Sequence, residues 1–284
     1  MPLLPRLINF LPVLALVAFA YGAEAQETSA WAQGHSSRVR LVGGGAAAGN
    51  QLAGVQIDLD PGFKTYWRSP GEAGLPPTFD WSKSVNVESA EVLWPAPSRF
   101  EDPGGIVFGY QGGVLFPVRI RPQDPSKPVG LALRIDYAVC KDICIPAQAE
   151  LSLKLPKTAS NAVRSSIETA LARVPRPPPL GADGELSILG AEPTIADGKP
   201  RLAVTVRAPV GAKPTLFVEP PENWFLLAAP QPLEPAKAGT QTFLVDVLER
   251  PADASGPIDL RLTLVAGDKA VETTTSLDAA QLTR

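Results

Sequence analysis

The sequence contains few of the side chains that carry most enzyme and metal chemistry. Its 284 residues include one histidine, one methionine and two cysteines. His35 lies in a polar stretch and is expected to be solvated, and the methionine is the initiator Met1. Soft-metal sites need several Cys, His or Met ligands, and general acid–base catalysis most often uses histidine. The sequence therefore predicts no metal site, no cofactor and no Cys–His nucleophile pair.

A strong charge of either sign is also missing. The chain has 26 Lys and Arg residues against 29 Asp and Glu residues, a formal net charge of −3, without a long run of like charge. Binding to nucleic acid normally requires a basic stripe or patch. The composition therefore predicts no nucleic-acid partner.

Only one long apolar run is present, and it lies near the N-terminus. The run from Leu7 to Ala20 follows a single basic residue and is too short to span a bilayer comfortably. The small residues of Ala23-Glu24-Ala25 then form a cleavage site, so we expect residues 1–25 to be a secretory signal peptide. The mature protein is expected in the periplasm, without stable membrane insertion.

Short segments of alternating apolar and polar residues, separated by many of the 31 prolines and 24 glycines, run through most of the chain. A period of two is typical of strands with one buried face, as in a sandwich. Helical spacing occurs from Ser160 to Val174, where Ser160 is placed to cap. We therefore predict an all-β fold of two immunoglobulin-like β-sandwich domains, residues 26–158 and 181–284, joined by a short helix and Pro-rich linker in residues 159–180.

The two cysteines lie four positions apart, between two alternating segments. In an extended strand they would be roughly 13 Å apart, at ~3.3 Å per residue, whereas a disulfide needs Cα atoms within ~4.4–6.8 Å. If Cys140 and Cys144 are bonded, the segment 141–143 must turn, which predicts the loop of a β-hairpin. Cys140 also continues an outward-facing series, so we expect its sulfur to point away from the sandwich core, within reach of a partner.

Geometry alone leaves the role of the cysteine pair open. A ring of about five residues stabilises a protein by only ~2 kcal/mol in the chain-entropy model, so a structural staple would more often join distant strands. Strained short-span disulfides are easier to reduce, which favours a redox role. A metal site would need more than two sulfur ligands.

Aromatic residues gather between positions 66 and 94 and could form a stacking surface for a sugar or peptide. They are Tyr66, Trp67, Phe79, Trp81 and Trp94. Because aromatic side chains in a sandwich most often fill the core, we interpret them as core residues.

The segment from Tyr137 to Pro146, which contains both cysteines, resembles the active-site hairpin of the periplasmic N-terminal domain of the DsbD/ScsB thiol:disulfide interchange proteins. Three further segments are similar to that family and occur in the expected order: Lys64–Pro76, Trp94–Glu101 and Gly109–Val118. The resemblance covers about residues 35–155. The cysteine spacing is closer to that of ScsB-type proteins, and the chain lacks the family's transmembrane and thioredoxin-like parts.

The resemblance implies that Cys140 and Cys144 exchange electrons with other thiol proteins. The expected partners are periplasmic thioredoxin-like or other thiol proteins and a separate membrane electron donor. The resemblance also implies a cap over the pair, formed by residues 100–105 (the cap segment), which include Phe100, Glu101 and Asp102. By analogy with the family, Cys144 is the cysteine that forms the mixed disulfide.

Charges near the pair are expected to tune its reactivity in opposite directions. Lys141 would favour the thiolate of Cys140, whereas Asp142, and Glu101 with Asp102 if the cap closes over the pair, would oppose it. We predict that the acidic residues dominate. The pair would then be a slow, partner-selective exchanger.

The sequence therefore predicts a periplasmic thiol–disulfide exchange protein that acts as an electron relay. The alternative is a non-catalytic periplasmic binding or assembly module in which the Cys140–Cys144 disulfide is structural. A redox domain should keep its fold when reduced, whereas a structural disulfide should resist glutathione, with a reduction potential below about −300 mV.

Overall fold

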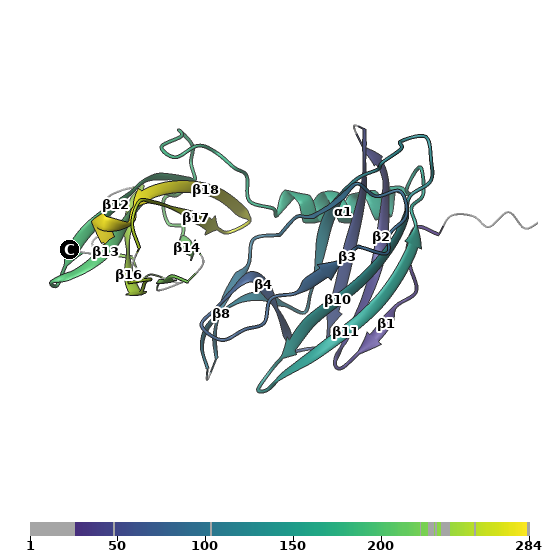
Figure 1. The fold of residues 1–284 in the computed structure, drawn as a ribbon, viewed down its shortest axis with the longest axis horizontal. Coiled ribbons are helices and arrows are strands. Elements are labelled where there is room, and N and C mark those ends of the chain that lie inside the picture. Colours follow the sequence, from purple (N-terminus) through teal and green to yellow (C-terminus); the bar gives the residue numbers. More distant parts are fainter. Residues whose placement is uncertain are drawn as a thin grey trace, which may run out of the picture.

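The computed structural model describes residues 26–47, 49–102, 104–221, 223–226, 230, 232–233, 239–252 and 254–282. The predicted signal peptide, residues 1–25, lies outside these described residues. Within them, the chain forms two β-sandwiches with one α-helix between them (Figure 1). No helix in the described ranges is long and apolar enough to cross a membrane.

The first sandwich consists of two antiparallel sheets. One sheet has the strand order β1 (Ala32–Gly34), β2 (Ser37–Ala47), β3 (Asn50–Leu59), β9 (Gly113–Arg121) and β6 (Ser89–Val92). The other has the order β11 (Cys144–Lys154), β10 (Gly130–Cys140), β4 (Lys64–Gly71), β8 (Gly105–Gln111) and β7 (Ser98–Asp102), with β5 (Thr78–Asp80) also paired to β10. This second sheet carries the cysteine pair.

The alternating residues fill the core between these sheets. Val55 and Ile57 of β3 face Leu133 and Ile135 of β10 within one buried cluster. Burial of such side chains, about 1.5–3 kcal/mol each, holds the two sheets together. The predicted all-β, immunoglobulin-like fold is confirmed.

Helix α1 (Asn161–Ala172) follows the first sandwich at the place that the sequence predicts. Ser160 is its N-cap residue, and its hydroxyl accepts a hydrogen bond from the backbone N–H of Val163. After the helix, the Pro-rich segment pairs with the second sandwich, because Arg176 exchanges backbone hydrogen bonds with Ala270 and Glu272 on β18. The spacer is therefore bonded to β18 at Arg176, and the hydroxyl of Thr273 adds a hydrogen bond to the carbonyl of Pro178.

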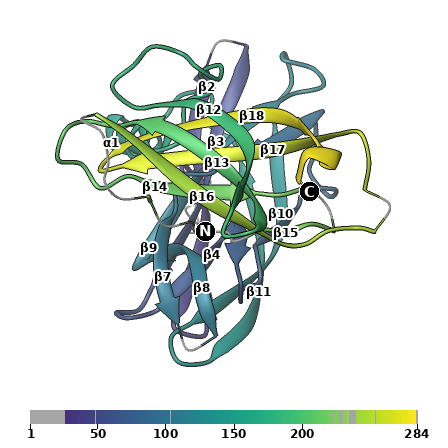
Figure 2. The same cartoon turned by 90° about the vertical axis from the view of Figure 1, so that its left-hand side faces the viewer.

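The second sandwich also has two sheets. One has the order β12 (Ser187–Ala196), β13 (Lys199–Arg207), β16 (Thr240–Glu249) and β15 (Phe225–Leu226), and the other has the order β14 (Thr215–Glu219), β17 (Pro257–Ala266) and β18 (Lys269–Asp278), with a final 3-10 turn η1 (Ala279–Leu282). Seen from its own side, its strands run across those of the first sandwich (Figure 2). The domain boundaries at residues 158 and 181 stay a prediction.

The contact between the sandwiches was not foreseen from the sequence. Phe217 of β14 is 1% exposed and belongs to the core cluster of the first sandwich, where its ring lies edge-on to Phe108 at 4.8 Å and to Trp67 at 5.7 Å. Arg68, which follows Trp67 on β4, donates two hydrogen bonds to Glu219, at 2.9 and 2.7 Å, and contacts Glu272. The second sandwich is thus anchored to strand β4.

Candidate active site at the β10–β11 hairpin

The two cysteines form a disulfide at the closed end of a β-hairpin. Cys140 ends β10, Cys144 begins β11, and the two are direct partners in the antiparallel register with Cα atoms 4.2 Å apart. The three residues between them make the turn. The register runs without a bulge from Gly130 opposite Lys154 to the cysteines, so strand pairing holds the two backbones together independently of the S–S bond.

The two cysteine residues differ sharply in exposure. Cys144 is exposed, as are all three residues of the turn, and Ile143 at its tip is 75% exposed. Cys140 does lie on the outer face of the sheet, as its position in the alternation predicts, but the expectation that a partner can reach it is wrong, because its residue is only 1% exposed. Side chains from other strands cover it in a small cluster separate from the sandwich core.

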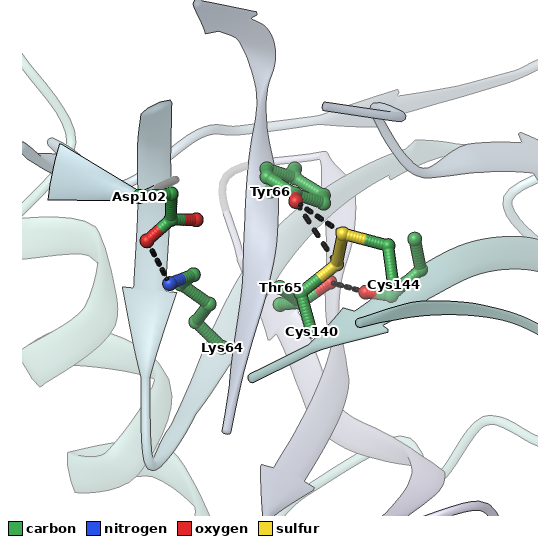
Figure 3. Close-up of a disulfide and its surroundings, with 7 residues drawn as sticks. Lys64, Thr65, Tyr66, Asp102, Cys140 and Cys144 are labelled. Carbon is green, nitrogen blue, oxygen red and sulfur yellow. Dashed lines mark hydrogen bonds and ion pairs between the residues drawn. A yellow bond between two sulfur atoms is a disulfide. The ribbon is translucent and has the colours of Figure 1, made fainter. Parts of the chain in front are cut away.

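Tyr66 of β4 makes the most direct contact with the disulfide. Its hydroxyl lies 2.9 Å from Sγ of Cys140 and 2.9 Å from Sγ of Cys144 (Figure 3). Burial, and next the charge of Asp102, raise the pKa of Tyr66 above its ordinary value, so the hydroxyl stays protonated and can donate to sulfur. The interpretation of Tyr66 as a core residue is wrong, because its ring packs in the cluster on the outer face of the sheet and not in the sandwich core.

Thr65 fixes the strand that carries Tyr66. Its buried hydroxyl donates a hydrogen bond of 2.9 Å to the backbone carbonyl of Ala138, two residues before Cys140. This bond crosses from β4 to β10 at the point where the two strands begin to pair. The tyrosine and the cysteines therefore sit on strands that are tied together beside the site.

Lys64 and Asp102 form an ion pair across strand β4 from the disulfide, with Nζ 2.5 Å from Oδ1 (Figure 3). Both side chains are mostly buried, at 11% and 16% exposed. Lys64 is the direct cross-strand partner of Cys140, so its side chain lies on the same face of the sheet as Cys140 and Tyr66. The sequence did not single out this lysine.

The structure brings some of the predicted cap residues to the disulfide and leaves others away from it. Phe100 packs against the outer cluster that contains Cys140. Glu101 points outward, 76% exposed, and pairs with Arg99 at 2.8 Å. The cap is the end of the β7–β8 hairpin, in which Asp102 pairs with Gly105, while Pro103 lies outside the described residues.

The two predicted residues of the turn itself, Lys141 and Asp142, are both exposed. The ammonium of Lys141 lies over the ring of Phe63, 5.8 Å from its centroid. His35 packs edge-on against the same Phe63 ring, with centroids 6.1 Å apart. These contacts place Lys141 along the rim of the hairpin.

A second loop, residues 72–77, also covers the site and was missed from the sequence. Gly74 packs on the ring of Tyr66 so closely that a Cβ there would be 2.7 Å from Cδ1. Glu72 fastens the loop to β8, because its backbone and its carboxylate both bond to the backbone of Ile106, each at 2.9 Å. Glycines within a Pro-rich loop were the available signal, since glycine often marks close approach of another group.

Most of the other aromatic residues pack in the core, as expected. Trp67 is fully buried, and Phe79 and Trp94 pack edge-on around Phe116. In the part of the chain that the structure describes, no group of three or more His, Cys, Asp or Glu side chains could hold a metal ion.

Comparisons with known proteins agree with this geometry. The family model for the N-terminal part of the thiol:disulfide interchange protein DsbD matches residues 40–156. The crystal structure of the N-terminal periplasmic domain of ScsB from Proteus mirabilis is similar, with a TM-score of 0.71 and 23% identity over 88% of this chain and 98% of that chain. At that identity, the likeness shows a shared fold.

The C-terminal domain of the AgI/II polypeptide BspA from Streptococcus agalactiae aligns over 84% of this chain and 96% of that chain, at 7% identity, but its TM-score of 0.18 carries no argument. A comparison with curated proteins finds no match. The family match spans the whole outer-face site, including the disulfide, Tyr66 and the Lys64–Asp102 pair. Residues 40–156 of this chain are therefore a domain of the DsbD N-terminal family.

Proposed function

We propose that the protein is a periplasmic thiol–disulfide exchange protein, which relays electrons through Cys140 and Cys144 between a membrane reductase and periplasmic partner proteins. One observation carries this proposal: an exposed cysteine is bonded to a buried one, and a protonated tyrosine hydroxyl lies 2.9 Å from both sulfurs. The family membership of residues 40–156 supports the same chemistry.

The asymmetry assigns a different part to each cysteine. A donor thiolate attacks Sγ of Cys144, the S–S bond breaks, and its electron pair leaves on Sγ of Cys140 as a thiolate. The second thiol of the donor then displaces Cys144 from the mixed disulfide. The donor becomes a disulfide and this chain a dithiol, so two electrons and two protons have been transferred. The same steps in reverse pass them to an oxidised partner.

The hairpin is suited to a bond that opens and closes. Continuous strand pairing holds Cys140 opposite Cys144 independently of the S–S bond. Reduction should therefore lower the free energy of unfolding by only the ~2 kcal/mol expected for a five-residue ring. We therefore expect the reduced protein to keep its fold. We also expect a reduction potential between about −120 and −270 mV, the range of exchange proteins.

Two single-cysteine variants test this proposal. In Cys140→Ser the remaining thiol is exposed, and in the matched Cys144→Ser it is the buried one. We expect the thiol of Cys140→Ser to react with an aromatic disulfide reagent at least ~10-fold faster, because access controls thiol reactivity. Equal rates, loss of the fold on reduction, or a potential below about −300 mV would favour the structural-disulfide alternative.

Tyr66→Phe should slow reduction of the disulfide by dithiothreitol about tenfold. The change removes one donor to the departing thiolate, and a hydrogen bond to a charged group contributes about 1.5–3 kcal/mol. Because the pKa of Tyr66 is raised, the hydroxyl is protonated throughout the range from pH 6 to 9. The ratio of wild-type to variant rates should therefore be the same at each pH, which stopped-flow fluorescence can measure; a ratio near one would exclude the proposed hydrogen bond.

A further inference from the structure

Lys64 lies where it can act on the chemistry of Cys140. The two residues are directly opposite each other on β4 and β10, and such pairs have Cβ atoms about 4.5–5.5 Å apart on one face of the sheet. The lysine side chain is 11% exposed, so bulk water screens its charge only in part. An ammonium in this position favours a thiolate on its neighbour.

In the closed site, however, the charge of Lys64 is offset by the cap. Asp102 accepts the 2.5 Å hydrogen bond from Nζ, and Phe100, two residues earlier on β7, has its ring centroid 5.6 Å from the same atom. Phe100 also packs on the cluster that buries Cys140. Lys64 therefore contacts two residues of the cap segment, Asp102 through an ion pair (Figure 3) and Phe100 through its ring.

Strand β7 is placed so that it can separate from the site. It is the edge strand of its sheet and pairs only with β8 among the strands that the structure describes. Because Phe100 packs on the cluster that buries Cys140, movement of β7 would remove part of that cover and, in the same step, withdraw the carboxylate of Asp102 from Lys64. Opening of the cap and release of the lysine charge are thus one event.

We propose that Lys64 couples opening of the cap to the reactivity of the disulfide. Paired with Asp102, it holds the cap closed; released, it stabilises the thiolate of Cys140. This inference rests on the proposed function. When a thiolate bonds to Sγ of Cys144 and the S–S bond breaks, the electron pair moves to Sγ of Cys140, and the unpaired ammonium of Lys64 stabilises that negative charge until a proton from solvent neutralises it. Lys64 is a positioning residue that makes no bond to the reacting sulfurs.

Two variants separate the two roles of Lys64: the ion pair with Asp102 that holds the cap closed (the latch) and the effect of its charge on Cys140. Asp102→Asn weakens the latch and leaves the cation, whereas Asp102→Asn combined with Lys64→Met weakens the latch and removes the cation. We expect Asp102→Asn to be reduced by dithiothreitol about threefold faster than wild type. In the double variant, loss of the cation should raise the pKa of Cys140, the leaving thiol, by ~1 unit. With a Brønsted coefficient of ~0.5, we expect the double variant to be reduced about threefold more slowly than Asp102→Asn.

A second readout follows the charge alone. In the reduced proteins, the midpoint of Cys140 alkylation by iodoacetamide against pH should lie about one pH unit higher in the double variant than in Asp102→Asn. Glu101→Gln, which removes the outward-facing acid of the same strand, is the matched control and should behave as wild type. Circular dichroism melting curves identify any variant that is not folded.

The outcomes are distinct. If Asp102→Asn and the double variant are reduced at the same rate with the same alkylation midpoint, Lys64 only holds the cap in place and the proposal is wrong. If Asp102→Asn is no faster than wild type, Asp102 is not a latch, and the proposal is also wrong. If wild type itself is not reduced at all, it is the exchange function that fails.

Discussion

Phe217→Ala should lower the free energy of unfolding by about 3–5 kcal/mol, the usual loss when a buried phenylalanine is truncated. The side chain comes from the second sandwich yet is 1% exposed within the core of the first, against Phe108 and Trp67. Its removal leaves a cavity that neither sandwich can fill alone. Chemical denaturation followed by tryptophan fluorescence measures the loss.

Phe225→Ala provides the matched control for this prediction. Phe225 belongs to the same sandwich but is 59% exposed, so its truncation should change stability by no more than about 0.5 kcal/mol. A similar small loss for Phe217→Ala would contradict the role of Phe217 as the anchor between the sandwiches. Two separate unfolding transitions in the variant would support that role further.

Arg68→Met should lower stability by about 2 kcal/mol, between the values for exposed and buried ion pairs. Arg68 is 18% exposed and holds two carboxylates of the second sandwich, Glu219 and Glu272. Burial lowers the pKa of Arg68, but hydrogen bonds and charge from Glu219 and Glu272 outweigh this and raise it overall. Methionine would leave Glu219 without the cation that it bonds and Glu272 with the longer, 3.8 Å contact to Arg261.

Arg119→Met is the corresponding control for the surface. Arg119 pairs with Glu91 at 2.6 Å, but the two side chains are 48% and 58% exposed, so the loss should be below about 1 kcal/mol. Denaturation curves at low and at 0.5 M salt distinguish the two cases, because salt screens the exposed pair more strongly. Equal losses for both variants would contradict the bridging role of Arg68.

The sequence was sufficient to predict the strands and the hairpin, because both depend on local patterns. Alternation identifies which face of β10 is buried, and four-residue spacing with an S–S bond requires a turn. What covers the outer face depends on segments distant in the sequence, however. Cys140 was therefore assigned to the correct face but expected to be exposed, and the tyrosine that contacts it was interpreted as a core residue.

The roles of Lys64, Gly74 and Phe217 could not be predicted from the sequence for a related reason. Each acts through a partner on another strand: Asp102 for the lysine, Tyr66 for the glycine and Trp67 for the phenylalanine. Nothing in the local pattern identifies such partners, since a lysine in a strand is usually solvated and a phenylalanine in a strand usually packs in its own sandwich. The local pattern also does not show that Asp102 pairs with a cation or that Glu101 turns outward.

The backbone bonds of Arg176 to both Ala270 and Glu272 give the Pro-rich spacer a further consequence. A free tether would let the two lobes tumble separately, and a protein that gripped both would lose affinity by immobilising them. Here the spacer is already hydrogen-bonded to β18, so the conformational entropy of a free linker has already been lost during folding. A partner protein would therefore bind two sandwiches that are already fixed relative to each other. Contacts with the second sandwich would then carry no additional entropic cost of ordering.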